Sequence, residues 1–457
     1  MDQLLTPRAQ EDSLRSEGDL NVGPERRAWA EETLDETARH WLERDSRVFL
    51  HQALSTPCLN VLQHCDGSYL EDVQGRRYLD FHGNSVHQIG HANPRVIQAI
   101  VEQMQALSFC PRRYTNLPAI QLAEKLTQLA PPGLGKVLFA PGGALAIGMA
   151  LKLARAATGR HKMIALWDAF HGASLDAISV SGEAIFRKGI GPLLPGVEHA
   201  PPPDPLGCPF HCGRACSLQC ADYIEYILEK EGDVAAVIAE TVRSTPFIPP
   251  KEYWRRVRAA CDRHGALLIL DEIPTCLGRT GALFACEHYG IVPDMLVLGK
   301  GLGGGIFPLA ALLARTELDV MPEGALGHYT HEKSPVACAA ALATLQYIEE
   351  EDLLARVGRM GVLALEEMRG LQQRFPLIHD VRGLGLLLGV ELVRQDGARA
   401  TEEAERILYA ALRRGLSFKI SMGNILTLAP PLTIHEEELR AAISILDECF
   451  QKVCAEP

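Results

Sequence analysis

Hydrophobic and polar residues follow two different periods between about residues 94 and 330. Short, continuously apolar runs predict strands at 136–140, 163–167, 234–240, 266–271, 295–298 and 309–314. Stretches with helical spacing, such as 144–157 and 252–264, lie between some of these runs. Strands that are apolar throughout are typical of parallel sheets with both faces covered. The pattern therefore predicts an α/β fold with a mostly parallel sheet.

The two ends of the chain show a different pattern. Residues 28–56 have helical spacing, and strands are expected at 59–65 and 69–72, with Asp66-Gly67 as a hairpin turn between them. A long helical region is expected at 335–375, a strand at 383–393 and a last helix at 434–454. We therefore expect a large domain at 76–334. Residues 1–75 should form an N-terminal arm and part of a smaller α+β domain, which 335–457 complete.

Composition narrows the functional classes. The chain has 457 residues and a formal net charge of −12, which argues against a nucleic-acid binder and favours small-molecule partners. No apolar run approaches the roughly 18 residues of a membrane helix. The first 25 residues are polar and charged, so we expect a flexible arm without a signal peptide. Thirteen scattered cysteines indicate a reducing, cytoplasmic location.

Four of these cysteines recur every four residues, at Cys208, Cys212, Cys216 and Cys220. Four thiols could bind zinc, but the usual knuckle has two residues between its cysteines. Free thiols that pack in a loop are the other interpretation. We assign no metal ligand from the sequence.

Two charged residues stand at the ends of apolar runs. One run ends at Asp271, and the run at 295–298 continues through Gly299 into Lys300, before a glycine-rich stretch. The carboxyl edge of an open α/β sheet is where ligands bind. An acid and an amine at that edge suit pyridoxal phosphate (PLP), whose ring nitrogen and aldehyde they would engage. A buried Asp–Lys ion pair would give the same pattern.

Two further segments fit such a cofactor. Run 136–140 leads through Pro141-Gly142-Gly143-Ala144 into a helix, where backbone N–H groups can bind phosphate. Run 163–167 leads to Phe170, whose ring could stack on a planar cofactor. An ordinary turn and a core phenylalanine are the alternatives.

An ordered series of motifs joins these segments. It comprises residues 79–83, 89–94, 142–144, 152–155, 158–160, 170–172, 239–240, 270–272, 278–281, 293–294, 299–301 and 430–432. Over about residues 50–450 the chain resembles the class III aminotransferase family of fold type I PLP enzymes. The resemblance implies that Lys300 is the Schiff-base lysine and that Asp271 holds the ring nitrogen. It also implies a homodimer, or a tetramer of such dimers, and a set of further cofactor-binding residues: Gly143, Ala144, Phe170, Glu240 and, toward the partner subunit's phosphate, Thr330.

The chain departs from the family pattern where substrate is held. Thr427 stands where the family carries an arginine for the α-carboxylate, Thr245 replaces the glutamate that pairs with that arginine, and Pro274 replaces a glutamine. A bidentate arginine is the usual way to orient a carboxylate. Without it, the substrate is expected to be an amine that lacks an α-carboxylate, unless another arginine has taken the role.

Other basic residues suit a phosphonate or phosphate group instead. The candidate substrate-binding residues are Arg112, Arg113, Arg243 and His82. This set resembles the lyase branch of the family. It implies elimination of a β-substituent from a small amino-phosphonate, such as 1-hydroxy-2-aminoethylphosphonate, with Lys300 as the base, to give an aldehyde and ammonia. The alternatives are an ω-aminotransferase that needs a keto acid and a phospho-lyase acting on phosphoethanolamine.

Overall fold

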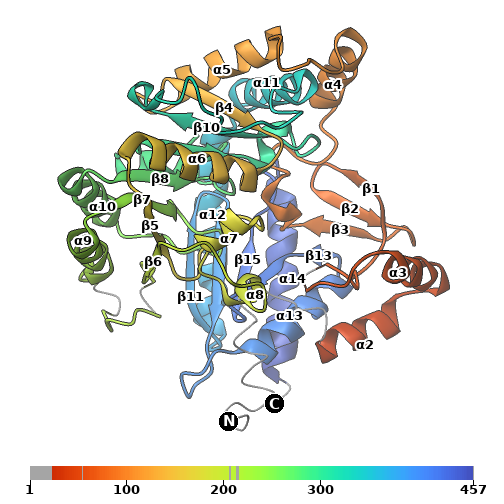
Figure 1. The fold of residues 1–457 in the computed structure, drawn as a ribbon. Helices are drawn as coiled ribbons and strands as arrows, with labels where there is room; N and C mark the ends of the chain where they lie inside the picture. The colour runs from red at the N-terminus through yellow and green to blue at the C-terminus, as the bar shows by residue number, and fades with distance from the viewer. Residues whose placement is uncertain (1–22, 54, 205–206, 213–215, 456–457) are drawn as a thin grey trace. The chain divides into compact units, whose positions relative to one another are not determined.

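The computed structural model describes residues 23–53, 55–204, 207–212 and 216–455 (Figure 1). Most of the arm expected at residues 1–25 lies outside the described residues. The chain divides into two compact units. Residues Asn93–Leu354 form one, called the sheet unit below, and Met1–Ala92 with Ala355–Pro457 form the other, called the terminal unit.

The sheet unit is built on a seven-stranded sheet (Figure 1). Strand β10 is antiparallel to both of its neighbours, and all other neighbouring strands are parallel. This confirms the expected α/β fold with a mostly parallel sheet. The strand order is β4 (Lys136–Ala140), β10 (Ala310–Ala314), β9 (Met295–Leu298), β8 (Leu267–Asp271), β7 (Val234–Glu240), β5 (Lys162–Leu166) and β6 (Val197–Ala200).

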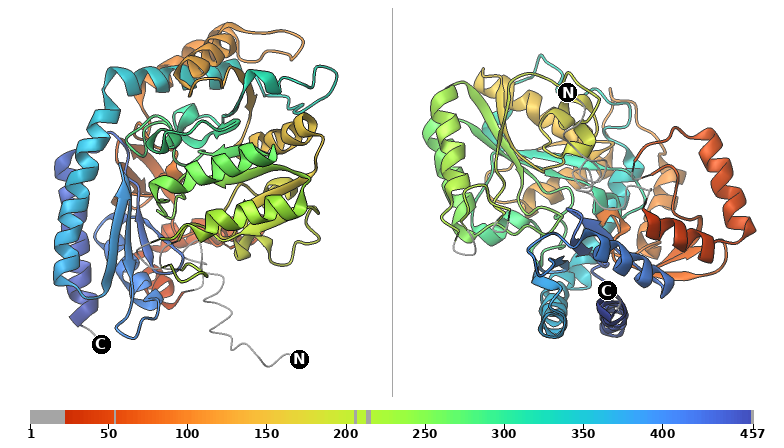
Figure 2. Two further views of the ribbon diagram at one scale, coloured as in Figure 1. Left: turned by 90° about the vertical axis from the view of Figure 1, so that its left-hand side faces the viewer. Right: turned by 90° about the horizontal axis from the view of Figure 1, so that it is seen from below.

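Both faces of the sheet are buried along strands β7 to β10, which is why these strands are almost entirely apolar. Helix α6 (Gly143–Thr158) shares one core cluster with alternate strand residues, including Met163 and Ile238. Leu268 and Leu296 alternate with members of that cluster and are fully buried as well. Side chains alternate between the faces of a strand, so other elements must cover the opposite face. Figures 1 and 2 show helices on either side of the strands.

The remaining helices of the sheet unit surround this core. Helices α9 (Gln219–Glu231) and α10 (Lys251–His264) pack against each other, and α11 packs against α4 and α5. Their bounds are α4 (Pro94–Ala106), α5 (Leu117–Leu129), α7 (Leu175–Ser179), α8 (Ala184–Arg187) and α11 (Pro335–Glu350). Asn93 and Asn116 cap α4 and α5 through side-chain oxygens that accept first-turn N–H groups.

The terminal unit contains two four-stranded sheets. One has the order β1 (Leu62–Asp66), β2 (Tyr69–Asp72), β3 (Arg77–Asp80) and β13 (Leu416–Ser417). The other has the order β11 (Ile378–Leu384), β12 (Leu387–Leu392), β15 (Ile425–Leu428) and β14 (Lys419–Ser421). Its helices are α2 (Pro24–Thr33), α3 (Glu36–Val48), α12 (Leu353–Arg374), α13 (Thr401–Arg413) and α14 (Glu436–Ala455).

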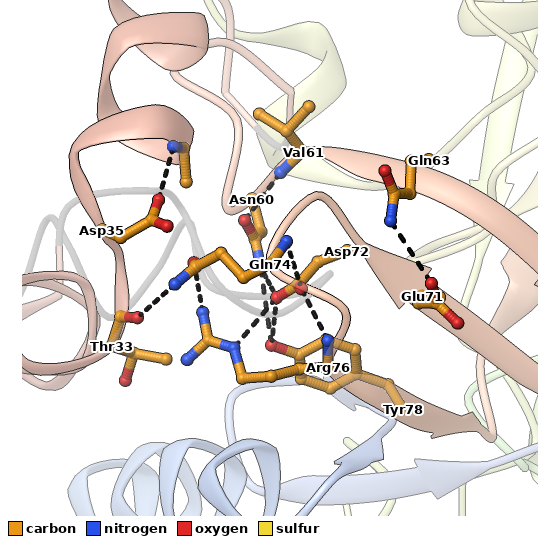
Figure 3. Close-up of polar contacts among 11 residues, drawn as sticks. Thr33, Asp35, Asn60, Val61, Gln63, Glu71, Asp72, Gln74, Arg76 and Tyr78 are labelled. Carbon is orange, nitrogen blue, oxygen red and sulfur yellow. Dashed lines mark hydrogen bonds and ion pairs between the residues drawn. The ribbon is translucent and has the colours of Figure 1, made fainter.

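A buried carboxylate organises the first of these sheets (Figure 3). Asp72 has no exposed surface, and its Oδ1 accepts from the backbone N–H groups of Gln74 and Arg76, both at 2.9 Å. Its Oδ2 accepts from Asn60 Nδ2 at 2.9 Å, Tyr78 Oη at 3.0 Å and Arg76 Nε at 3.1 Å. These bonds close the turn between β2 and β3. The hairpin expected at Asp66-Gly67 joins β1 to β2 and is confirmed.

Several elements differ from the sequence prediction. The strand expected at 383–393 is the end of β11 and all of β12, which form a hairpin with a turn at 385–386. The helix expected at 28–56 is two helices, because Asp35 leaves the helical conformation and caps α3 by accepting from Ala38 N at 2.8 Å. The helix expected at 335–375 breaks before α12, where Asp352 has φ +46°. Strand β6 was not predicted, because its sequence, Val-Glu-His-Ala, is half polar at the sheet edge.

The boundaries of the compact units along the chain differ from the expected domain boundaries. The chain passes from one unit to the other at 92/93 and 354/355, whereas the expected boundaries were 75/76 and 334/335. Strand β3 belongs with the terminal unit because it pairs with β2 and with β13. Helix α11 belongs with the sheet unit because it packs on α4 and α5. Across the part of the chain that is described, no helix combines the length and apolarity that a bilayer crossing requires.

Candidate functional site

Two neighbouring strands of the sheet unit end in acidic residues at one edge, and a lysine follows the end of the third strand beside them. Glu240 is the last residue of β7 and lies in register with Asp271, the last residue of β8. Strand β9 is parallel to β8 and ends two residues before Lys300. The carboxyl edges of parallel strands meet on the same side of a sheet. The fold thus brings together the acid and the amine that the sequence analysis singled out.

Asp271 is held in a fixed orientation. It is 2% exposed, and its Oδ2 lies 2.7 Å from His171 Nδ1, while its Oδ1 accepts from Ile273 N at 3.0 Å. His171 is itself buried, and its backbone N–H donates to Ser181 Oγ at 2.9 Å. The carboxylate therefore keeps one geometry, with the imidazole on one side and a backbone amide on the other.

The turn between β4 and α6 leaves backbone donors available. Gly142 caps α6 without any side-chain hydrogen bond, so the first N–H groups of the helix, beginning at Gly143 and Ala144, have no acceptor from a capping side chain. A Cβ on Gly143 would lie 2.7 Å from Ile273 Cδ1, so a larger residue there would require the Ile273 side chain to move. An uncapped helix N-terminus with small residues can receive a phosphate group.

Phe170 lies in the loop that follows β5. Its ring is partly exposed, and it packs against Phe186 with ring centroids 4.3 Å apart. A Cβ on Gly172 would meet Ala144 Cβ at 2.5 Å, so this loop lies directly against the start of α6. The loop that carries Phe170 and the helix N-terminus are therefore close together.

Lys300 follows β9 in an unusual backbone conformation. Its φ is +47°, in the left-handed region that most side chains avoid, and the residue is exposed. Such backbone strain is common at functional sites. Together, an exposed amine, a fixed carboxylate and an uncapped helix N-terminus fit the aldehyde, ring nitrogen and phosphate of PLP.

Arg243 is embedded between two acids. The residue is 7% exposed, and its guanidinium forms an ion pair with the fully buried Glu183. Its Nε lies 3.8 Å from Glu240 Oε2. Burial raises the pKa of Glu240 above its usual range, although the Arg243 guanidinium nearby lowers it. The arginine expected to bind substrate thus already has its charge compensated by carboxylates.

Four further residues, Arg112, Arg113, Thr330 and His82, were predicted for the site. Arg112 and Arg113 are exposed in the loop before α5, and Arg112 Nη2 lies 2.6 Å from His328 Nε2. Thr330 is exposed in the same region as His328. His82 belongs to the terminal unit, where its backbone N–H donates to Asp80 Oδ1 at 2.9 Å.

The two threonines that replace the expected acid and arginine are both buried. Thr245 is 1% exposed, and its hydroxyl has no hydrogen-bond partner among the described residues. Thr427 is 4% exposed and donates from Oγ1 to Ser421 Oγ at 3.0 Å within the terminal unit.

Two members of this group were not expected from the sequence. His171 belongs to the motif at residues 170–172 but was given no role, and Glu183 was not recognised. Glu183 follows Gly182 in the loop after α7, and nothing in its local pattern marks it.

Comparisons with known proteins agree with this geometry. Residues 51–450 match the model of the family described as aminotransferase class-III. The chain is 49% identical, over 96% of both chains, to (R)-1-hydroxy-2-aminoethylphosphonate ammonia-lyase of Vibrio splendidus. It is 36% identical to leucine/methionine racemase of Thermococcus litoralis, covering 90% of this chain and 95% of the racemase.

Solved structures show the same fold. An (S)-enantioselective ω-transaminase from Thermomicrobium roseum matches with a TM-score of 0.85 and 30% identity, covering 92% of this chain and 100% of that one. A PLP-bound amine transaminase from an uncultivated Pseudomonas species matches with a TM-score of 0.82 and 32% identity, covering 89% of this chain and 98% of that one. This chain belongs to the class III aminotransferase family.

Proposed function

We propose that this chain is a PLP-dependent ammonia-lyase that converts 1-hydroxy-2-aminoethylphosphonate into an aldehyde and ammonia. One observation carries the proposal: 49% identity, over 96% of both chains, to a relative that bears this activity in its name. The site supports the same conclusion. It retains Asp271 and Lys300, while threonine occupies positions 245 and 427, where an acid and a carboxylate-binding arginine are expected.

The cofactor roles follow from the donors at the sheet edge. We assign Lys300 to the covalent bond with PLP, Asp271 to the ring nitrogen and Phe170 to stacking on the ring. Gly143 and Ala144 would donate backbone N–H groups to the phosphate. Glu240, which lies in register with Asp271 on the neighbouring strand, would be the remaining cofactor-binding residue. When bound, PLP supplies the electron sink that stabilises the carbanion formed on the substrate.

Lys300 then performs the proton transfer. The Lys300 amine, released from its covalent bond when the substrate's amino group replaces it, would take a proton from the carbon that bears that amino group, and hydroxide would leave the adjacent carbon. The resulting enamine becomes an imine, and water hydrolyses it to the aldehyde and ammonia. The water lost in the first step is consumed in the last, so no keto acid and no redox partner enter the balance.

The phosphonate needs cations of its own. Arg243 is already engaged by Glu183 and Glu240, so we assign the phosphonate first to the exposed Arg112 and Arg113. His82 remains a further candidate. Guanidinium groups bind such oxyanions through paired hydrogen bonds.

We also propose that the chain forms a homodimer. Exposed apolar residues follow one stripe of α4 and continue beyond it: Ile97, Val101, Met104, Leu107 and Phe109. A stripe of this kind is typical of an interface. In the dimer, Thr330 would reach the PLP phosphate of the partner.

A cytoplasmic location is supported by the thirteen cysteines, which are all free thiols.

The test is incubation of the PLP-loaded protein with each enantiomer of the substrate and no keto acid. Ammonia and aldehyde should form over many turnovers, and Lys300→Ala should abolish both, whereas Lys251→Ala, which removes an exposed lysine of α10, should not. Turnover only after a keto acid is added would identify an aminotransferase. Phosphate release from phosphoethanolamine would identify a phospho-lyase. Either result would overturn the proposal.

A further inference from the structure

A short segment after α7, residues 181–187, packs against the loop that carries Phe170. Both neighbours of Phe170 form hydrogen bonds with this segment: Ala169 O accepts from Gly182 N at 2.8 Å, and His171 N donates to Ser181 Oγ at 2.9 Å. A Cβ on Gly182 would lie 2.4–2.5 Å from backbone atoms of residues 166–168, so the close approach of the two segments requires glycine. The backbone on either side of Phe170 is therefore held by residues 181–187.

The same segment is tied to the sheet edge on both sides of Phe186. Before it, Glu183 forms the buried ion pair with Arg243, which follows β7. After it, the guanidinium carbon of Arg187 lies 5.3 Å from the ring centroid of Trp167, which follows β5. Phe186 thus lies in the middle of a short helix, α8, whose two ends are bound to different loops of the site.

The ring of Phe186 covers one face of Phe170. The ring centroids are 4.3 Å apart and the planes are inclined by 36°, so the two rings lie face toward face and do not meet edge to face. Both rings are partly exposed. An aromatic ring has two faces, and only the opposite face of Phe170 remains for a planar cofactor.

We propose that Phe186 is a positioning residue for the cofactor. It fixes the orientation of the Phe170 ring, so that the free face of this ring is ready for the PLP ring before the cofactor binds. Side chains of a site keep a productive geometry when packing locks their rotamers. The inference rests on the proposed role of Phe170 in stacking on PLP, and it does not depend on the reaction that is catalysed.

Titration of the apoprotein with PLP tests this role. Absorbance would report binding, and visible circular dichroism would report whether the bound PLP ring is held in one orientation. Phe186→Ala should raise the PLP dissociation constant about fivefold and weaken the circular dichroism per bound PLP. Phe186→Leu, which keeps apolar volume without a flat ring, should behave in the same way, whereas Phe186→Tyr should retain both properties. Tyr226→Ala, which removes an exposed stacked ring of α9, is the control and should change neither.

A double-mutant cycle with Phe170→Ala separates positioning from general packing. If Phe186 acts through Phe170, Phe186→Ala should have no further effect on PLP affinity or circular dichroism once Phe170 is replaced. Equal effects in both backgrounds, or no effect of Phe186→Ala by itself, would overturn the inference. The cycle measures cofactor binding and not turnover. A lack of ammonia release from the unmodified protein would therefore overturn the proposed function and leave the role of Phe186 standing.

Discussion

The buried pair of Glu183 and Arg243 offers the sharpest test of the site's architecture. Both side chains are almost inaccessible, at 0% and 8% exposure. Glu183→Gln removes the charge but keeps the shape of the side chain. Removing one partner of a buried ion pair commonly costs 3–5 kcal/mol, because the remaining charge is left uncompensated. Arg243 would still have Glu240 as a partner, with Oε2 3.8 Å from its Nε. We therefore expect Glu183→Gln to lower the free energy of unfolding by about 3 kcal/mol, the lower end of that range.

A double-mutant cycle measures this coupling. The free energy of unfolding in urea would be compared for the unmodified protein, Glu183→Gln, Arg243→Gln and the double variant. The double variant should lose less than the sum of the two single variants, because neither charge is then left alone. The exposed pair Arg255–Glu252, at 3.0 Å and about 60% exposure, is a matched control and should couple by less than about 1 kcal/mol.

The result that would refute the reasoning is additivity. If the two single losses sum to the double loss, Glu183 and Arg243 are not energetically coupled, and Arg243 is then available to bind a substrate anion. A coupling as small as that of the exposed control pair would lead to the same conclusion. A large coupling would support the assignment of Arg243 to the architecture of the site.

Three further predictions concern pH and substrate. Burial would raise the pKa of Asp80, but its hydrogen bond with His91 helps to lower this pKa from 3.8 to about 2. The ionised carboxylate should therefore add about 2 kcal/mol to the free energy of unfolding above pH 4, and this contribution should vanish toward pH 2. In urea unfolding, Asp80→Asn should be less stable than the unmodified protein at pH 6 and equal to it at pH 2. Burial raises the pKa of Glu272 from 4.5 to about 7. The free energy of unfolding should therefore fall by about 3 kcal/mol as the pH rises from 4.5 to 7, because the buried carboxyl group must then ionise. Urea unfolding of Glu272→Gln over the same pH range should not show this fall. Arg112→Gln and Arg113→Gln should each raise KM for the phosphonate about tenfold with little change in kcat, and an unchanged KM in ammonia-release assays would contradict their assignment.

The sheet could be predicted from sequence wherever burial on both faces produced an unbroken apolar run. Val234–Glu240 is buried at every position, and its predicted and observed bounds coincide. Edge strand β6 has two adjacent polar residues, Glu198 and His199, and gave no such signal. The helix breaks at Asp35 and Asp352 were missed, because helical spacing continues on both sides and only a local cap or a left-handed residue interrupts it.

For the site, residues that lie at the end of a strand were predictable, and contacts between distant loops were not. Asp271 and Lys300 each follow an apolar run, so their place at the sheet edge could be inferred. The ion pair of Arg243 joins residues 60 positions apart. Neither partner has a periodic pattern, and burial of Glu183 depends on how its loop folds over the sheet. Such a pairing becomes visible only in three dimensions.

The charge balance of the buried group limits how the substrate can be held. Glu183, Glu240 and Asp271 carry three negative charges when ionised, whereas Arg243 and Lys300 carry two positive ones, which leaves one net negative charge. A phosphonate dianion would be repelled by this group alone, and the repulsion would be strong because burial reduces screening. Binding therefore requires cations from outside the group. The exposed arginines before α5, Arg112 and Arg113, can supply them.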